Sequence, residues 1–127
     1  MATKRHLQMA EQVLIAAWSL APGRAHNVRA MDEESRRVTI ASWAEAIAGM
    51  NVPDEAIGEA VFWWANNRAE KEMLSPQGIK EAARTVVGKW EQDPQKRAVL
   101  ERRREIRREE RDQRIGLIAN GEHRALE

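Results

Sequence analysis

The amino-acid sequence predicts an all-α fold, a small four-helix domain followed by a long charged C-terminal helix. Apolar residues recur at helical spacing, and proline or acidic residues stand where the helices begin. No alternation of β-branched residues is long enough for a strand, and no internal repeat is present. At Asp93-Pro94 the chain changes from apolar and tryptophan-containing to strongly charged. We therefore expect a helical domain over residues 1–92, a charged helical arm over residues 93–119 and a disordered tail over residues 120–127.

The composition indicates one modest domain with an appendage. The chain has 127 residues, 43% of them hydrophobic, enough for one core. Residues 1–95 hold 11 Lys+Arg against 13 Asp+Glu, and residues 96–127 hold 10 against 7, so the C-terminal part is the cationic one. Without cysteine the chain can form neither a disulfide nor a thiolate zinc site. We recognise no signal peptide and no membrane span, and expect a cytoplasmic protein without membrane association.

The first two helices are expected over residues 4–20 and from Asp32 to about Gly49. Ala21-Pro22-Gly23 ends the first helix, because proline and glycine interrupt helices. Asp32 suits the N-cap position of the second helix, and the acidic residues after it favour the positive end of the helix dipole. The residues expected on the buried stripes are Leu7, Ala10, Leu14, Ala17 and Trp18 in the first helix and Ile40, Trp43, Ala44, Ile47 and Met50 in the second.

The third helix is expected from Pro53 to about Glu70, and the fourth from Ser75-Pro76 to about Trp90. Both begin with proline at the first helical position, where its missing N–H is not needed. The residues expected to face the core are Ile57, Ala60, Val61 and Trp64 in the third helix and Ile79, Ala82, Ala83, Val86 and Trp90 in the fourth.

The fifth helix, from Pro94 to about Ala119, has no continuous apolar face. Val99, Leu100 and Ile106 are followed by charged and polar residues as far as Ile115. Exposed pairs at i,i+3 or i,i+4 spacing, each worth about 0.2–0.5 kcal/mol, are expected to support the helix. These pairs are Glu101–Arg104, Glu105–Arg108 and Glu110–Arg114, and Asn120-Gly121 is the expected C-cap.

Three consecutive aromatic residues, Phe62-Trp63-Trp64, form the first candidate binding feature. Consecutive helical positions lie about 100° apart, so one buried stripe cannot hold all three rings. With Trp64 in the core, Phe62 and Trp63 lie on either side of it. They are either covered by another helix of the bundle or form a contact surface for a protein partner or a second copy of the chain.

The charged arm is the second candidate surface. Its arginines are Arg102, Arg103, Arg104, Arg107, Arg108 and Arg111. Guanidinium groups bind phosphate and carboxylate groups, but the glutamates on the same helix repel a phosphate backbone. A protein partner therefore ranks ahead of DNA, and a solvated helix without a binding role stays equally open.

The fourth helix offers an alternative nucleic-acid surface, because four of its polar residues suit DNA contacts: Gln77, Lys80, Arg84 and Lys89. A helix-turn-helix motif, however, requires a turn of three or four residues before this helix. The connector from Arg68 to Leu74 is longer and charged.

No catalytic, metal-binding or cofactor-binding signature is found in the sequence. His6, His26 and His123 lie far apart, with no carboxylate or second histidine at ligand spacing. The serines lack a recognisable base or nucleophile elbow, and the glycines form neither a P-loop nor a dinucleotide fingerprint. We therefore expect a non-enzymatic protein that needs no metal and no cofactor.

The order of features over residues 7–90 resembles that of small phage and prophage replication proteins that load or inhibit the replicative DNA helicase. The residues that carry this resemblance are Asp32-Glu33-Glu34 leading to Trp43, Val52-Pro53-Asp54-Glu55, Ala60-Val61, and Leu74-Ser75-Pro76-Gln77-Gly78-Ile79 followed by Lys80 and Arg84. The chain departs from the family pattern at Phe62-Trp63-Trp64, which replaces polar and aromatic positions, and in its helical rather than disordered C-terminal segment.

The resemblance implies an all-helical domain with a mobile C-terminal segment that engages the helicase, while the domain meets an origin-binding protein or the helicase itself. The implied role is a replication adaptor that loads or inhibits the helicase without chemistry of its own. The alternatives are a DNA-binding phage regulator or packaging protein, which would use the helix over residues 76–91 or the arginine-rich arm, and a purely structural homodimer.

Overall fold

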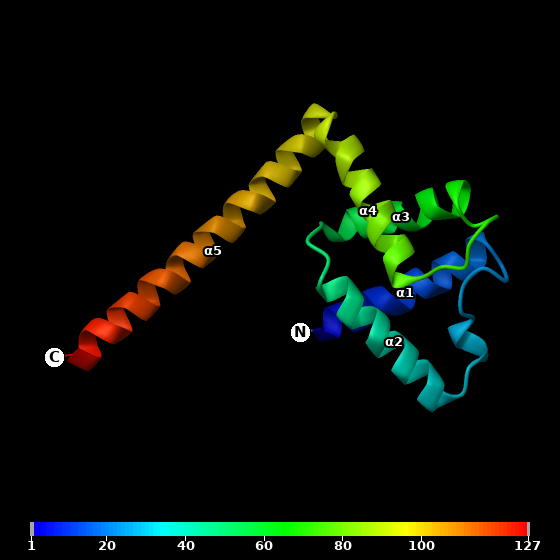
Figure 1. Cartoon of the computed structure of the whole chain (residues 1–127), viewed down its shortest axis with the longest axis horizontal. Helices are drawn as coiled ribbons and strands as arrows, with labels where there is room; N and C mark the ends of the chain where they lie inside the picture. Colours follow the sequence, from blue (N-terminus) through cyan, green and yellow to red (C-terminus); the bar gives the residue numbers. More distant parts are fainter. Residues whose placement is uncertain (1, 127) are drawn as a thin grey trace. The chain divides into compact units, whose positions relative to one another are not determined.

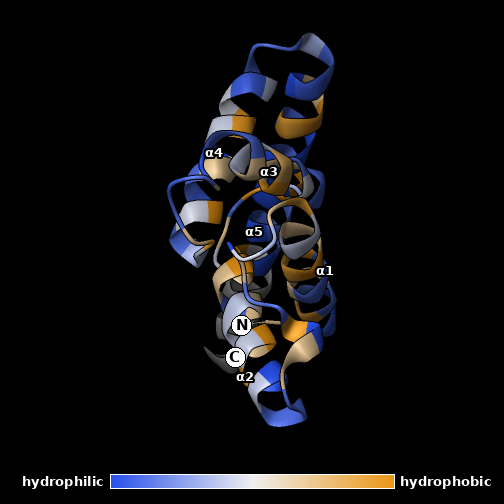
Figure 2. Ribbon diagram, turned by 90° about the vertical axis from the view of Figure 1, so that its right-hand side faces the viewer, coloured by the Kyte–Doolittle hydropathy of each residue, from blue (hydrophilic) through white to orange (hydrophobic). Residues whose placement is uncertain are grey.

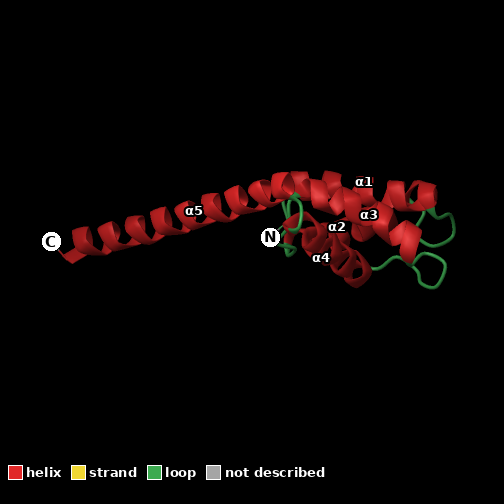
Figure 3. Cartoon of the chain, turned by 90° about the horizontal axis from the view of Figure 1, so that it is seen from above, coloured by secondary structure: helices red, strands yellow, loops and turns green. Residues whose placement is uncertain are grey.

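A computed structural model describes residues 2–126 of the chain, with side chains described up to Gly116. Within this range the structure contains helices and loops but no strand, which confirms the all-α fold (Figures 1 and 3). Its elements are α1 (Lys4–Leu20), a short 3-10 turn (Val28–Ala30), α2 (Glu33–Ala48), α3 (Asp54–Asn67), α4 (Pro76–Glu91) and α5 (Pro94–Leu126). The chain divides into two units, Met1–Lys89 and Trp90–Glu127, which are described separately below.

Helix α1 begins at the residue that the sequence predicts. His6 takes the part of the usual glutamate in a capping box, because its Nδ1 accepts a hydrogen bond of 2.9 Å from the backbone N–H of Thr3. The buried residues of α1 are Ala10, Val13, Leu14 and Ala17. Leu7, expected in the core, is instead 40% exposed, since it lies two turns before Leu14 at the end of the helix, where less of the domain covers it.

Helix α2 confirms both its predicted cap and its predicted buried face. Asp32 Oδ1 accepts a hydrogen bond of 2.8 Å from the backbone N–H of Ser35, and Oδ2 accepts one of 2.9 Å from the Ser35 hydroxyl. These bonds stabilise the charged carboxylate and lower the pKa of Asp32 below its ordinary value. All five residues predicted for the buried face are buried: Ile40, Trp43, Ala44, Ile47 and Met50.

Helix α3 ends at Asn67, three residues before the predicted Glu70. The backbone N–H groups of Arg68 and Ala69 both bond to the carbonyl of Trp64, at 2.8 and 3.1 Å, and the chain turns there. The turn is also fixed from outside, because Arg24 donates a hydrogen bond of 2.9 Å to the Glu70 carbonyl. This tertiary contact is absent from the local sequence pattern. At the other end Pro53 is the N-cap residue rather than the first helical residue.

Helix α4 starts at Pro76, as predicted, and Ser75 caps it by accepting a hydrogen bond of 3.0 Å from the Gly78 N–H. The predicted core residues of α3 and α4 are all buried: Ile57, Ala60, Val61, Trp64, Ile79, Ala82, Ala83, Val86 and Trp90. In the first unit, α1 packs against both α2 and α3. Figure 2 shows hydrophobic and hydrophilic residues interspersed along α1 and α3, as expected of helices with one buried face.

Helix α5 starts at the predicted Pro94 but is longer than the sequence predicts. It continues to Leu126, through Asn120-Gly121 and the segment expected to be disordered, whereas Glu127 lies outside the described residues. One glycine inside a helix costs only about 1 kcal/mol, so the helix can pass through this position. Among its aliphatic residues Leu100 is buried, while Val99 and Ile106 are 49% and 47% exposed.

Candidate partner-binding surfaces

Four arginines of α5 lie along one side of the helix. At about 100° per residue, they fall within an arc of about 100°. We call these four the arginine stripe: Arg104, Arg107, Arg108 and Arg111. All four are exposed, and the stripe is about 10 Å long at a rise of about 1.5 Å per residue. Arg102 and Arg103, which the sequence grouped with them, lie outside this arc, and Arg103 is half-buried.

Most acidic residues of α5 form a second stripe beside the first. The members of this acidic stripe are Glu101, Glu105, Glu109 and Asp112, which share an arc of about 80°. The centre of the acidic stripe lies about 110° around the helix from the centre of the arginine stripe. Most charged residues between Glu101 and Asp112 therefore lie on a cationic or an anionic stripe, with Arg102 next to the acidic stripe and Glu110 outside it.

The ion pairs that the structure forms at the start of the arm differ from those that the sequence predicts. Arg104 pairs with Glu91 at 2.6 Å instead of with Glu101, and Glu101 pairs with Arg97 at 3.2 Å. The turn between α4 and α5 brings Glu91 within reach of Arg104, a contact that i,i+4 spacing cannot reveal. Arg104 is therefore held at the start of the stripe, and the exposed residues Arg107, Arg108 and Arg111 present its remaining cations.

The aromatic pair beside Trp64 is covered unequally. Phe62 is 58% exposed, so no helix of the bundle covers it. Trp63 is half-buried, and the Arg68 guanidinium lies 5.4 Å from its ring centroid, within cation–π range. Phe62 is thus the aromatic ring available for contact with another molecule.

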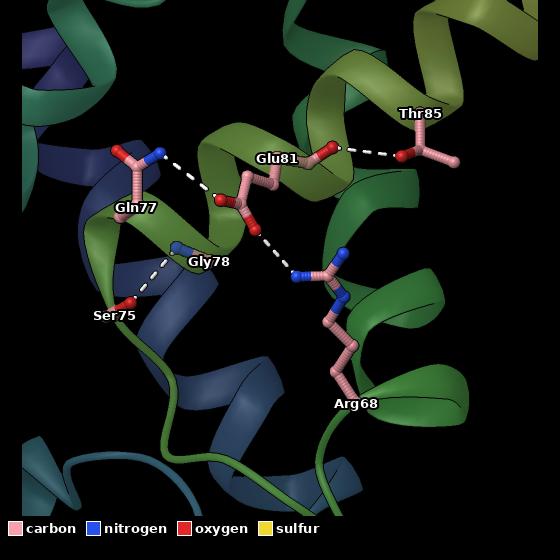
Figure 4. A network of polar contacts seen from close by, with 6 residues as sticks. All are labelled: Arg68, Ser75, Gln77, Gly78, Glu81 and Thr85. Atoms are coloured by element: carbon pink, nitrogen blue, oxygen red, sulfur yellow. Dashed lines mark hydrogen bonds and ion pairs between the residues drawn. The ribbon is translucent and has the colours of Figure 1, made fainter.

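Three of the four candidate DNA-binding residues of α4 lie on the same face of the helix. Gln77, Lys80 and Arg84 are exposed and share one face at i, i+3 and i+7 spacing, whereas Lys89 lies about 140° from Arg84. The carboxylate of Glu81 lies on the same face (Figure 4).

Figure 4 shows the two side chains that donate hydrogen bonds to this carboxylate. Arg68 donates a hydrogen bond of 2.6 Å to Glu81 Oε2, and Gln77 donates a longer one of 3.4 Å to Glu81 Oε1. Both bonds lower the pKa of Glu81, the one from Arg68 more strongly, so the carboxylate stays charged at neutral pH. The Gln77 amide, the expected base-reading group, is thus directed at an acid of its own helix. This arrangement weakens the case for α4 as a DNA-recognition helix.

A groove between α1 and α3, with a volume of about 350 Å³, is a feature that sequence reasoning missed. Its lining residues are Arg5, Gln8, Met9, Gln12, Val13 and Ala16 from α1 and Asp54, Ile57, Gly58, Val61 and Phe62 from α3. At the end where both helices begin, Arg5 and Asp54 form an ion pair of 3.2 Å. The only local signal for the groove is Gly58 one helical turn before the exposed Phe62. The sequence could not show that α1 lies alongside.

Among the described residues, no cluster of His, Cys, Asp and Glu side chains has the arrangement of a metal site. The same part of the chain contains no helix with the length and apolarity needed to cross a membrane. Comparison with protein-family models, curated proteins and solved structures finds no match to this chain. The described residues present three candidate binding surfaces: the two charged stripes of α5, the exposed ring of Phe62 and the groove between α1 and α3.

Proposed function

We propose that the protein is a cytoplasmic, non-enzymatic adaptor of phage-type DNA replication, which binds a replicative helicase through its arm and loads or inhibits it. The observation that carries the proposal is the charge segregation of α5. Arg107, Arg108 and Arg111 are exposed on a helix that buries little apolar surface beyond Leu100. A long helix of this kind gains few stabilising contacts within its own chain, whereas its charged faces suit a partner.

The two stripes favour a protein partner over a nucleic acid. A duplex presents a uniformly negative backbone, which attracts the arginine stripe but repels the acidic stripe about 110° away. A protein surface can place its carboxylates against the arginine stripe alone, so the acidic stripe does not oppose the binding of a protein partner. The choice of a helicase as this protein rests on the resemblance of residues 7–90 to helicase loaders and inhibitors.

The helix starts that carry this resemblance have structural counterparts in the domain. Asp32 caps α2, Pro53 precedes α3, and Ser75-Pro76 starts α4. Trp43 and Ile79, which belong to the same pattern, are buried. These features support the proposed layout of a helical domain that carries the arm, with no catalytic step assigned to either.

The test uses two variants of the same helix, one that removes three charges from the arginine stripe and one that removes three from the acidic stripe. One variant replaces Arg107, Arg108 and Arg111 by glutamine. Its matched control replaces Glu105, Glu109 and Asp112 by their amides. Glutamine is a good helix former, and asparagine has a helix propensity similar to that of the aspartate it replaces, so both variants are expected to fold.

Pull-down of purified replicative helicase should succeed with the full chain and the acidic-stripe control but fail with the arginine-stripe variant and with a chain ending at Gln92. DNA binding is measured in parallel as a function of salt. If the arm binds B-form phosphates, the log-log salt slope shrinks by up to about 2.7 in the arginine-stripe variant, about 0.9 per lost contact. A shrinking slope together with no helicase captured would replace the adaptor proposal by the DNA-binding one.

A further inference from the structure

The face of α3 that borders the groove holds a protruding ring and an unfilled space one helical turn apart. Phe62 is 58% exposed, and Gly58 is exposed with nothing within 4 Å of the position where a side chain would begin. Residues four apart lie on the same side of a helix. The same surface therefore offers both halves of a packing contact, an aromatic ring and the room to receive one.

The polar groups of the groove in one copy of the chain also complement the same groups in a second copy. Its two charged lining residues, Arg5 and Asp54, already neutralise each other at 3.2 Å, so two copies of this surface meet without like-charge repulsion. Gln8 and Gln12 line the α1 side. Each glutamine amide both donates and accepts hydrogen bonds, so it can pair with the same amide of another copy.

We propose that the groove between α1 and α3 is a self-association surface, on which Phe62 of a second copy packs beside Gly58. A two-fold axis makes the contact reciprocal, because each copy supplies one ring and receives one. A strongly charged partner gains nothing specific from this neutral groove, whereas a second copy matches it at the ring, the glycine, the ion pair and the amides. The inference is independent of the proposed role of the arm.

The test begins with the oligomeric state of the full chain, measured by sedimentation equilibrium over a range of concentrations. The parent protein is expected to show a concentration-dependent equilibrium between monomer and dimer. Phe62→Ala removes both rings, and Gly58→Met fills both spaces. Each substitution is expected to weaken dimerisation by about a hundredfold or more, because burial of one aromatic ring is worth more than tenfold in a binding constant and two such contacts are lost.

Both variants are expected to keep the fold, which circular dichroism and thermal melts verify. Phe62 is mostly exposed, and methionine is a better helix former than the glycine it replaces in open space. Val38→Ala removes an equally exposed aliphatic side chain from α2, outside the groove, and should leave the dimer unchanged.

A mixture of the two variants tests the reciprocal packing itself. The Gly58→Met chain still carries its ring, and the Phe62→Ala chain still has the space, so the heterodimer regains one of the two contacts. It should therefore form about tenfold more tightly than either variant dimerises alone. A monomeric parent, a dimer that survives Phe62→Ala, or a mixture no tighter than its components would each overturn the inference.

Discussion

The two neighbouring tryptophans of α3 give the sharpest test of the fold, because the same chemical change meets different surroundings. Trp64 is fully buried, and its replacement by alanine should cost about 3–5 kcal/mol in lost burial and residual cavity. Trp63 is half-buried beneath Arg68. Its replacement loses a cation–π contact of about 0.5–1 kcal/mol and part of the ring's burial, about 1–2 kcal/mol in all.

Urea unfolding followed by far-UV circular dichroism measures both losses, provided that the m-value stays constant. For a domain of this size each kcal/mol lowers Tm by about 4–8 °C, so Trp64→Ala should leave little folded protein at physiological temperature.

A third variant, Trp64→Phe, refines the comparison. The Nε1 of Trp64 is buried, and no hydrogen-bond partner for it is found among the described residues. An unpaired buried donor costs about 1–3 kcal/mol, so phenylalanine recovers part of what its smaller volume loses and should be tolerated far better than alanine. If Trp63→Ala proved as damaging as Trp64→Ala, the register assigned to α3 would be wrong.

Two further predictions concern the cap of α2 and the start of the arm. Asp32→Ala should lower Tm at neutral pH, and because the hydrogen bonds from Ser35 lower the pKa of Asp32 below its ordinary value of 3.8, this loss of Tm should shrink as pH falls through the folded-state pKa. Thermal melts of parent and variant from neutral to acidic pH measure the loss, and a loss that stays constant over this range would show that the bonds are unimportant. A chain ending at Arg104 should keep the Tm of the full chain, since residues 105–116 are exposed. A chain ending at Gln92 should melt at a lower temperature, because it loses Lys96, which lies 4.6 Å from the ring centroid of Trp90. Equal melting temperatures for the two truncated chains would contradict this reasoning.

Local signals in the sequence predict the helix starts well. The caps at Asp32 and Ser75 and the first residue of α5, Pro94, depend on side chains within three residues of the helix start. The buried stripes of α2, α3 and α4 follow from helical periodicity alone. In α1, Leu7 is exposed and Trp18 only half-buried, although both were expected in the core, because periodicity gives the direction of a side chain but not the extent of the neighbouring helices.

Features that depend on contacts between distant residues were not predictable. The end of α3 involves the bond from Arg24 to the Glu70 carbonyl, and the pair of Arg104 with Glu91 requires the turn between two helices. The groove likewise needs α1 beside α3. For the arm, by contrast, the predicted helix from Pro94 to about Ala119 already contains both stripes, so helical periodicity could have separated the arginines from the acidic residues in the sequence.

The most direct test of the adaptor account is the affinity of the chain for a purified replicative helicase, measured by biolayer interferometry at fixed ionic strength. The account predicts that the parent binds and that the variant lacking Arg107, Arg108 and Arg111 binds at least about tenfold more weakly, mainly through slower association, as expected for exposed charges. The acidic-stripe control should retain helicase binding far better than this variant. Equal affinity of the parent and the arginine-stripe variant, or no binding by the parent, would contradict the claim that the arginine stripe recruits the helicase.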